Sequence, residues 1–209
     1  MAEFDPEKAR SDFLIAMYNQ MMNDINRHII VVWQDVGVLL GAFAVFALVE
    51  KQILSLDIAT ALIILLCIWM LAHVYDASYW YNRNLVIIAN IERQFLRDSD
   101  LKEIHYYFGT HRRTGAMITH LEIQMWLALA VAALVLTVHL VTVIIPIYCL
   151  HTKTGTGLSA LPWVVALAGL VAWRYSHMKA RRRYETFLQN SPGKVIDDSN
   201  IRHGPGHPV

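Results

Sequence analysis

Residues Ile123–Leu150 read IQMWLALAVAALVLTVHLVTVIIPIYCL and contain no Asp, Glu, Lys or Arg. A helix rises about 1.5 Å per residue, so roughly 20 apolar residues cross the hydrocarbon core of a bilayer. This stretch therefore predicts a membrane-spanning helix. Three other apolar segments predict further spans: Ile29–Val49, Ile58–Tyr75 and Leu158–Tyr175. We expect an all-α polytopic membrane protein with four spans arranged as two hairpins.

The distribution of basic residues predicts the orientation of these spans. The chain has 18 Lys and Arg residues, and only Lys51 and Lys153 lie in the two short connectors, Glu50–Asp57 and His151–Gly157. Positive charge is concentrated in the cytoplasmic loops of membrane proteins. Both termini and the segment between the second and third spans are therefore predicted to be cytoplasmic.

The segments outside the spans predict long helical extensions. Asp5-Pro6-Glu7 is typical of a helix start, because Asp is a good N-cap and Pro suits the first helical position. No Pro or Gly follows until Gly37, so the first helix is expected to run unbroken to about Val49. The fourth helix is expected to continue past the membrane to Asn190, before Ser191-Pro192-Gly193.

The predicted organisation has five parts. A cytoplasmic amphipathic helix at 1–28 precedes a first transmembrane hairpin at 29–75. A cytoplasmic helical segment at 76–122 leads to a second hairpin at 123–175. The chain closes with a cytoplasmic helix and tail at 176–209.

Ionisable side chains within or beside the apolar segments are the candidate functional residues. They are Asp35, His73, Asp76, Glu122 and Arg174. A charge at the centre of a membrane helix costs at least about 2.5–3.5 kcal/mol, so it normally has a partner or water. We expect a polar layer that joins the helices. The layer could line or gate an ion path, or its ion pairs could only fix the register of the helices.

Two patterns predict helix packing or self-association. Gly37-x-x-x-Gly41 permits close approach of membrane helices, within the chain or between copies. Tyr81, Ile88 and Phe95 belong to an apolar stripe on the extension of the second helix. Leaving such a stripe in water is costly, at about 25 cal/mol per Å². The stripe therefore favours a second copy or a cytoplasmic protein as its partner.

The sequence shows no established catalytic motif. No Cys/His metal set, serine triad or paired carboxylates stands out, and the two cysteines, Cys67 and Cys149, are expected to be free packing residues. We expect no cofactor, no metal, no nucleic-acid partner and no enzyme activity. One alternative stays open, because Arg113 and His120 have a spacing used by metal-independent ribonucleases.

The run Tyr79–Leu96 reads YWYNRNLVIIANIERQFL and follows the second predicted span. It resembles the juxtamembrane helix of small four-helix bacterial inner-membrane proteins, namely the RipA-type family and comparable proteins found beside bacterial defence genes. The resemblance implies a bacterial inner-membrane location and an oligomer, with a ring as one arrangement. It also implies that the cytoplasmic extensions contact neighbouring copies. It implies no catalytic residues.

These observations lead to one functional hypothesis and two alternatives. The hypothesis is a self-associating inner-membrane protein that forms a pore or perturbs the membrane in response to a cytoplasmic signal, in defence or stress. The first alternative is a non-catalytic membrane scaffold that docks a cytoplasmic partner. The second is a membrane-tethered ribonuclease using Arg113 and His120.

Overall fold

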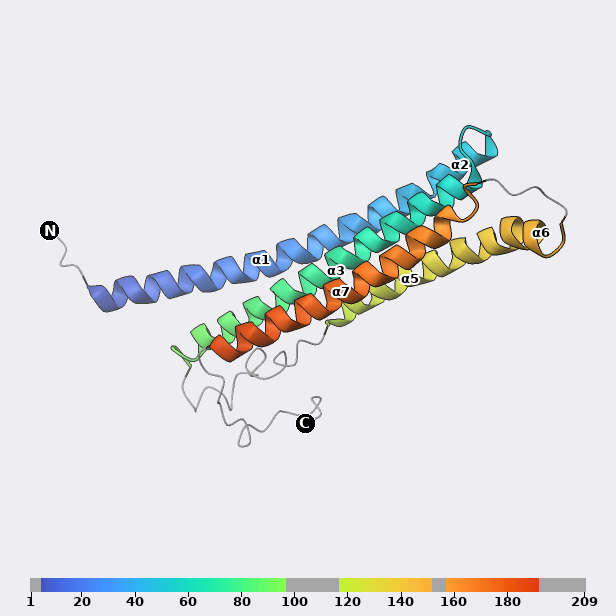
Figure 1. The fold of residues 1–209 in the computed structure, drawn as a ribbon. Helices are drawn as coiled ribbons and strands as arrows, with labels where there is room; N and C mark the ends of the chain where they lie inside the picture. The colour runs from blue at the N-terminus through green and yellow to red at the C-terminus, as the bar shows by residue number, and fades with distance from the viewer. Residues whose placement is uncertain (1–4, 97–116, 152–156, 192–209) are drawn as a thin grey trace, which may run out of the picture. The chain divides into compact units, whose positions relative to one another are not determined.

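The computed structural model describes residues 5–96, 117–151 and 157–191. Within these ranges the regular secondary structure is all helical, with no strand, which confirms the all-α class (Figure 1). The elements are α1 (Pro6–Ala42), α2 (Ala44–Glu50), α3 (Leu56–Glu92), α5 (Thr119–His139), the π-helix η1 (Leu140–Ile144), α6 (Ile145–Tyr148) and α7 (Leu161–Asn190).

Three helical stretches are long and apolar enough to cross a membrane. They are Pro6–Glu50, Leu56–Glu92 and Thr119–Tyr148. This finding suggests a membrane protein. The predicted fourth span is not among them, because the apolar part of α7, Leu161–Trp173, is followed at once by Arg174. Four spans therefore stay a prediction.

The first helix begins as predicted but does not run unbroken. The Asp5 carboxylate accepts hydrogen bonds from the backbone N–H groups of Glu7 (3.0 Å) and Lys8 (3.2 Å), so Asp5 is the N-cap. The helical stretch reaches Glu50, past the predicted end at Val49, but one turn at Phe43 divides it into α1 and α2. There the Phe43 N–H bonds to the carbonyl of Leu40, only three residues back (3.2 Å). Gly41 beside it has a low helix propensity, which favours a break at this place.

The third apolar stretch is also less regular than predicted. It passes from α5 into η1 and then α6, with Pro146 in the first turn of α6. Proline has no backbone N–H, so it cannot donate the usual helical hydrogen bond to the fourth residue before it. The helix widens into the π-helix η1 just before Pro146, and both proline and π-helical turns are common places for a helix to bend.

The chain divides into two compact units, each of which we describe by itself. Unit 1 comprises Met1–Ile29, Ser78–Ala116 and Arg181–Val209, and unit 2 comprises Ile30–Ala77 and Met117–Ala180. The structure does not test the predicted division into five parts, which stays a prediction.

The core of unit 2 is apolar and closely packed. Its fully buried side chains include Leu39 of α1 and Ile63 and Met70 of α3, against Ala128 and Val131 of α5. In this unit α3 and α7 run in the same direction, since Ile68 lies beside Gly169 and Tyr75 beside His177.

The close helix approach in this unit is at Gly169, where sequence analysis did not place one. A Cβ atom at Gly169 would overlap the side chain of Ile68, whereas one at Gly37 or Gly41 would meet nothing within 4 Å. Gly169 is therefore the glycine that the contact between α3 and α7 requires. The Gly37-x-x-x-Gly41 pattern does not serve packing within the described part of the chain.

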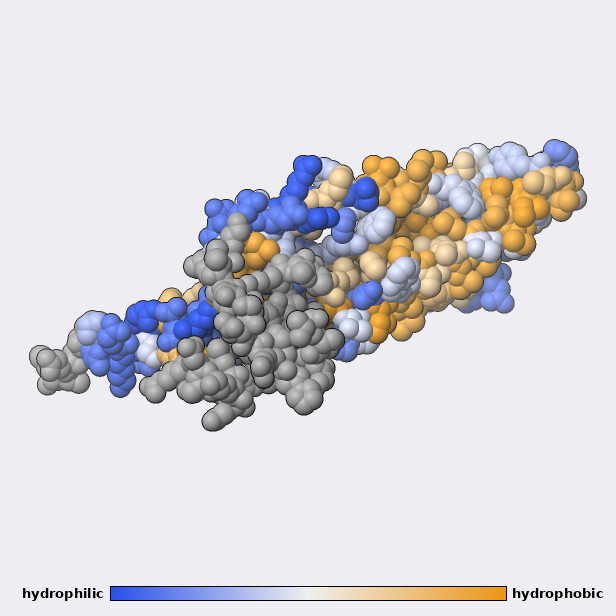
Figure 2. Space-filling view, turned by 90° about the horizontal axis from the view of Figure 1, so that it is seen from below, coloured by the Kyte–Doolittle hydropathy of each residue, from blue (hydrophilic) through white to orange (hydrophobic). Residues whose placement is uncertain are grey.

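The outer surface of unit 2 is apolar as well. Exposed side chains include Trp126 of α5 and Val164, Leu167 and Val171 of α7. Figure 2 shows an extended hydrophobic surface in orange, with the hydrophilic residues gathered elsewhere. Soluble monomers rarely expose apolar patches beyond a few hundred Å². Such a surface is expected of helices that face lipid.

Unit 1 has a small core of its own. Ile25 of α1 packs with Leu85 and Ile88 of α3, and Tyr18, Met21 and Tyr81 lie around them. In this unit α1 and α3 run in opposite directions, because Tyr18 contacts Glu92 while His28 stacks on Trp80. Of the three predicted stripe residues, Ile88 is buried and Tyr81 packs beside it, whereas Phe95 is exposed.

Candidate functional site

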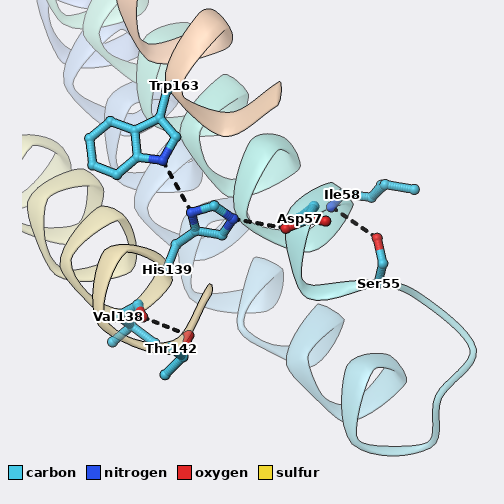
Figure 3. A network of polar contacts seen from close by, with 7 residues as sticks. All are labelled: Ser55, Asp57, Ile58, Val138, His139, Thr142 and Trp163. Carbon is cyan, nitrogen blue, oxygen red and sulfur yellow. Dashed lines mark hydrogen bonds and ion pairs between the residues drawn. The ribbon is translucent and has the colours of Figure 1, made fainter. Parts of the chain in front are cut away.

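A buried histidine in unit 2 connects three helices through side-chain hydrogen bonds (Figure 3). His139, at the end of α5, has 0% of its surface exposed. Its Nε2 lies 2.9 Å from Asp57 Oδ1 in the first turn of α3. Its Nδ1 accepts a hydrogen bond of 3.2 Å from the indole N–H of Trp163 in α7. We call Asp57, His139 and Trp163 the His139 cluster.

The two hydrogen bonds indicate which tautomer of the neutral His139 ring fits the cluster. An indole N–H can only donate, so Nδ1 must present its lone pair to Trp163. In a neutral imidazole the hydrogen atom is then on Nε2, and this N–H donates a hydrogen bond to the Asp57 carboxylate. Both ring nitrogens are therefore engaged. His139 cannot act as a general base while Trp163 holds its lone pair, and the cluster acts as a cross-link of helix ends.

Local sequence explains how each member reaches the cluster. The Ser55 hydroxyl accepts a hydrogen bond from the Ile58 N–H (3.3 Å), which caps the start of α3 and places Asp57 in its first turn. An acidic residue is favourable at a helix N-terminus. His139 is the last residue of α5, where η1 begins.

The second buried carboxylate of unit 2 is Asp35 on α1, and it lies beside His73 of α3. Asp35 Oδ2 is 3.0 Å from His73 Nδ1, with side-chain exposures of 5% and 38% respectively. The angles at this contact do not fit a hydrogen bond, and the two side chains form an ion pair only when His73 is protonated. The Trp69 ring covers His73 at 4.4 Å between centroids. We call this contact the Asp35–His73 pair.

The structure brings together two of the five predicted polar-layer residues. Asp35 and His73 are in contact, whereas Asp76, Glu122 and Arg174 are exposed. Among residues 5–96, 117–151 and 157–191, these three side chains form no hydrogen bond or ion pair. A layer that joins all the helices is thus not assembled within this part of a single chain, and it stays a prediction.

The role of Asp57 and Trp163 was not predicted from the sequence. Asp57 was expected in a connector, and His139 was not among the candidate functional residues. The Ser55-x-Asp57 pattern at a helix start was a usable signal for an acidic first turn. Nothing in the sequence connects that turn with His139, because the two are 82 positions apart.

Unit 1 contains a buried acid of a different kind. The Tyr18 hydroxyl donates a hydrogen bond to Glu92 Oε1 (3.4 Å). Burial raises the pKa of the Glu92 carboxyl above its ordinary value, and the Tyr18 hydrogen bond and the Arg93 charge oppose that shift. Burial and the Glu92 charge likewise raise the pKa of the Tyr18 hydroxyl.

We expect Glu92→Gln to flatten the pH dependence of stability. With its folded-state pKa raised, Glu92 contributes stability that is complete below its ordinary pKa of 4.5 and is lost as pH rises through the folded value. Glutamine does not titrate, so the melting temperature should fall less between about pH 4 and about pH 7. The exposed Glu185→Gln variant is the control. Identical pH profiles for Glu92→Gln and the wild type would contradict the expectation.

Over the described ranges, no group of three or more His, Cys, Asp and Glu side chains is placed to hold a metal ion. His120, one half of the ribonuclease alternative, is exposed in the first turn of α5. Its proposed partner Arg113 lies outside the described residues, so that alternative is not tested.

In comparisons with known proteins, no protein-family model, no curated protein and no solved structure matches this chain. The resemblance of Tyr79–Leu96 to RipA-type proteins therefore stays a prediction.

Proposed function

We propose that this protein is a self-associating bacterial inner-membrane protein whose oligomer forms a pore or perturbs the membrane in response to a cytoplasmic signal. It crosses the bilayer four times as two hairpins, with both termini in the cytoplasm. The placement of Lys and Arg and the resemblance to RipA-type proteins support the orientation and the location. The exposed glycine face of α1 is the observation that carries the proposal of self-association.

The fourth span is supported by the surface of α7. Val164, Leu167 and Val171 are exposed on this helix, and they belong to the same unit as the three apolar stretches. An apolar helix face in water would be costly, whereas in lipid it is favourable. The direction that α7 shares with α3 also fits two hairpins inserted side by side.

The glycine face lies on α1 and α2. Gln34, Gly37, Gly41 and Ala44 are all exposed, and they recur at steps of three or four residues. Small residues allow two membrane helices to approach closely, and a polar side chain among them can hydrogen-bond across the contact. Because a Cβ atom at Gly37 or Gly41 meets nothing within 4 Å in the described part of this chain, the space there is open for a second copy.

A pore would have to form between copies. The interior of unit 2 is filled by buried apolar side chains such as Leu39, Ile63 and Met70. Such a core resembles the close-packed interior of any helical bundle, so we place the ion path outside it. Polar residues at the surface, such as Gln34 and Glu122, become pore-lining only when several copies surround them.

Bulky residues on the glycine face should prevent assembly. We expect the double variant Gly37→Leu/Gly41→Leu to weaken self-association by about tenfold or more, or about 1.4 kcal/mol, without a clash inside the chain. Native mass spectrometry of the detergent-solubilised protein measures the oligomer, and ion flux from liposomes measures the activity. Ala130→Leu, at an exposed position of α5, is the matched control.

The outcomes separate the proposal from its rival. A wild-type protein that is monomeric in detergent and in liposomes contradicts self-association. An oligomer that conducts no ions under any condition contradicts the pore and favours a scaffold for a cytoplasmic partner. One observation favours that second candidate, because Phe13, Ile15 and Phe95 are exposed on unit 1.

A further inference from the structure

Unit 1 holds two arginine side chains against aromatic rings. The guanidinium carbon of Arg183, on α7, lies 4.4 Å from the centre of the Tyr79 ring on α3. The guanidinium carbon of Arg83, on α3, lies 4.9 Å from the Trp80 ring and 5.8 Å from the Phe187 ring. Contacts of this kind attract a cation to the face of the ring.

The rings are themselves held in place. Tyr79 meets Trp80 edge to face, with centroids 5.5 Å apart, and His28 stacks on Trp80 at 6.2 Å with an interplanar angle of 8°. Tyr184, which is buried, lies against Phe187 at 6.3 Å. Three helices therefore fix the surfaces on which Arg83 and Arg183 rest.

Two other arginines of unit 1 have acidic partners. Arg181 bonds to Glu185 at 2.8 Å, and Arg27 pairs with Asp24 at 3.1 Å. Neither Arg83 nor Arg183 has a carboxylate partner within the described ranges. A guanidinium that rests its face on a ring keeps its N–H groups free at the edge of the plane. These two residues thus offer uncompensated positive charge and free donors.

The position of this cluster along its helix suits the lipid headgroup region. Tyr79 and Arg83 follow the predicted membrane end at Tyr75 by one and two helical turns, about 6 and 12 Å at 1.5 Å per residue. The polar headgroups occupy about 5–8 Å on each side of the hydrocarbon core. Side chains on a helix lean toward its N-terminus, so Arg83 leans back along α3 toward Tyr75. Trp and Tyr are typical of this depth.

We propose that Arg83 and Arg183, held by Trp80 and Tyr79, bind the phosphate group of an anionic phospholipid. Arginine forks match phosphate oxygens geometrically, and two such cations without acidic partners favour a lipid whose headgroup carries a net negative charge. The site rests on the proposed membrane insertion. It requires neither self-association nor ion flux.

The test is a lipid titration of the purified full-length chain in detergent, followed by native mass spectrometry. Phosphatidylglycerol is the probe, and phosphatidylcholine is the zwitterionic comparison. A basic residue near the membrane surface contributes about 1 kcal/mol, so each of Arg83→Gln and Arg183→Gln should weaken phosphatidylglycerol binding about fivefold, and the double variant about 30-fold. Arg181→Gln is the matched control, because Arg181 is already paired with Glu185.

Three results would overturn the proposal. They are equal binding of both lipids, an equal loss in Arg181→Gln, and displacement of phosphatidylglycerol by millimolar inorganic phosphate, which would indicate a soluble phosphate ligand instead. Melting curves in phosphatidylcholine micelles check that the variants fold. If Arg83→Gln does not fold, phosphatidylglycerol binding by the exposed Arg183→Gln variant tests the proposal by itself. The oligomer mass is read in the same spectra, so a failure of self-association is seen separately.

Discussion

His139→Ala is expected to lower the free energy of unfolding by about 2–4 kcal/mol, because it removes a buried hydrogen bond to a carboxylate and a second one from an indole N–H. The substitution removes the imidazole that contacts the Asp57 carboxylate, and it removes the acceptor of the Trp163 indole N–H. A buried polar group that loses a hydrogen bond carries a desolvation cost. The change also removes the one side chain through which α3, α5 and α7 are joined in this cluster.

The measurement is reversible unfolding in mixed micelles, followed by circular dichroism. His120→Ala is the control, since His120 is an exposed histidine on the same helix and should change stability by no more than about 0.5 kcal/mol. Trp163→Phe keeps an aromatic ring but removes the N–H donor and part of the volume of the indole, so a loss of about 1 kcal/mol or more is expected. A loss below about 1 kcal/mol in His139→Ala would show that the cluster does not hold the helices together.

Ile63→Ala is expected to destabilise the chain by about 2 kcal/mol or more, because Ile63 is fully buried at 0% exposure in the core of unit 2. Between membrane helices the gain comes mainly from close packing, since lipid is as apolar as the side chains. The cavity left by the missing atoms therefore accounts for most of the cost.

Leu62→Ala is the matched control for this variant. Leu62 is the preceding residue and is 41% exposed, so its truncation leaves lipid to fill the space and should cost well under 1 kcal/mol. Unfolding of both variants in the same micelles provides the comparison. Equal losses would mean that Ile63 does not face a packed interior. They would also remove the reason for placing a pore between copies instead of within one chain.

The sequence predicted the helices of this fold better than the irregular turns that interrupt them. An apolar stretch without charges and the Asp5-Pro6 start each depend on nearby residues alone, and the structure contains the corresponding helices. The break at Phe43 and the π-helix before Pro146 were not predicted. Both reflect small local preferences of Gly41 and Pro146, which a strong apolar pattern conceals.

In the candidate site, too, some contacts were predicted from the sequence and others were not. Asp35 and His73 were singled out together because an ionisable residue in an apolar segment needs a partner, and they are in contact. The partners of His139 were not singled out from the sequence. Asp57 looks like an ordinary residue at a helix start, and Trp163 looks like a residue at a membrane interface. The aromatic faces under Arg83 and Arg183 also depend on how α3 and α7 align.

By itself, the sequence determined that this protein is helical and has stretches able to cross a membrane, because hydropathy and helix signals act over neighbouring residues. Only the tertiary structure decided which glycine permits close packing and which carboxylate meets which histidine. Gly169, rather than Gly37 or Gly41, lies against a neighbouring helix, and Asp57 meets His139 across a gap of 82 residues. Such pairings depend on the rotation and register of each helix against its neighbours, and small differences in packing energy along whole helices set these.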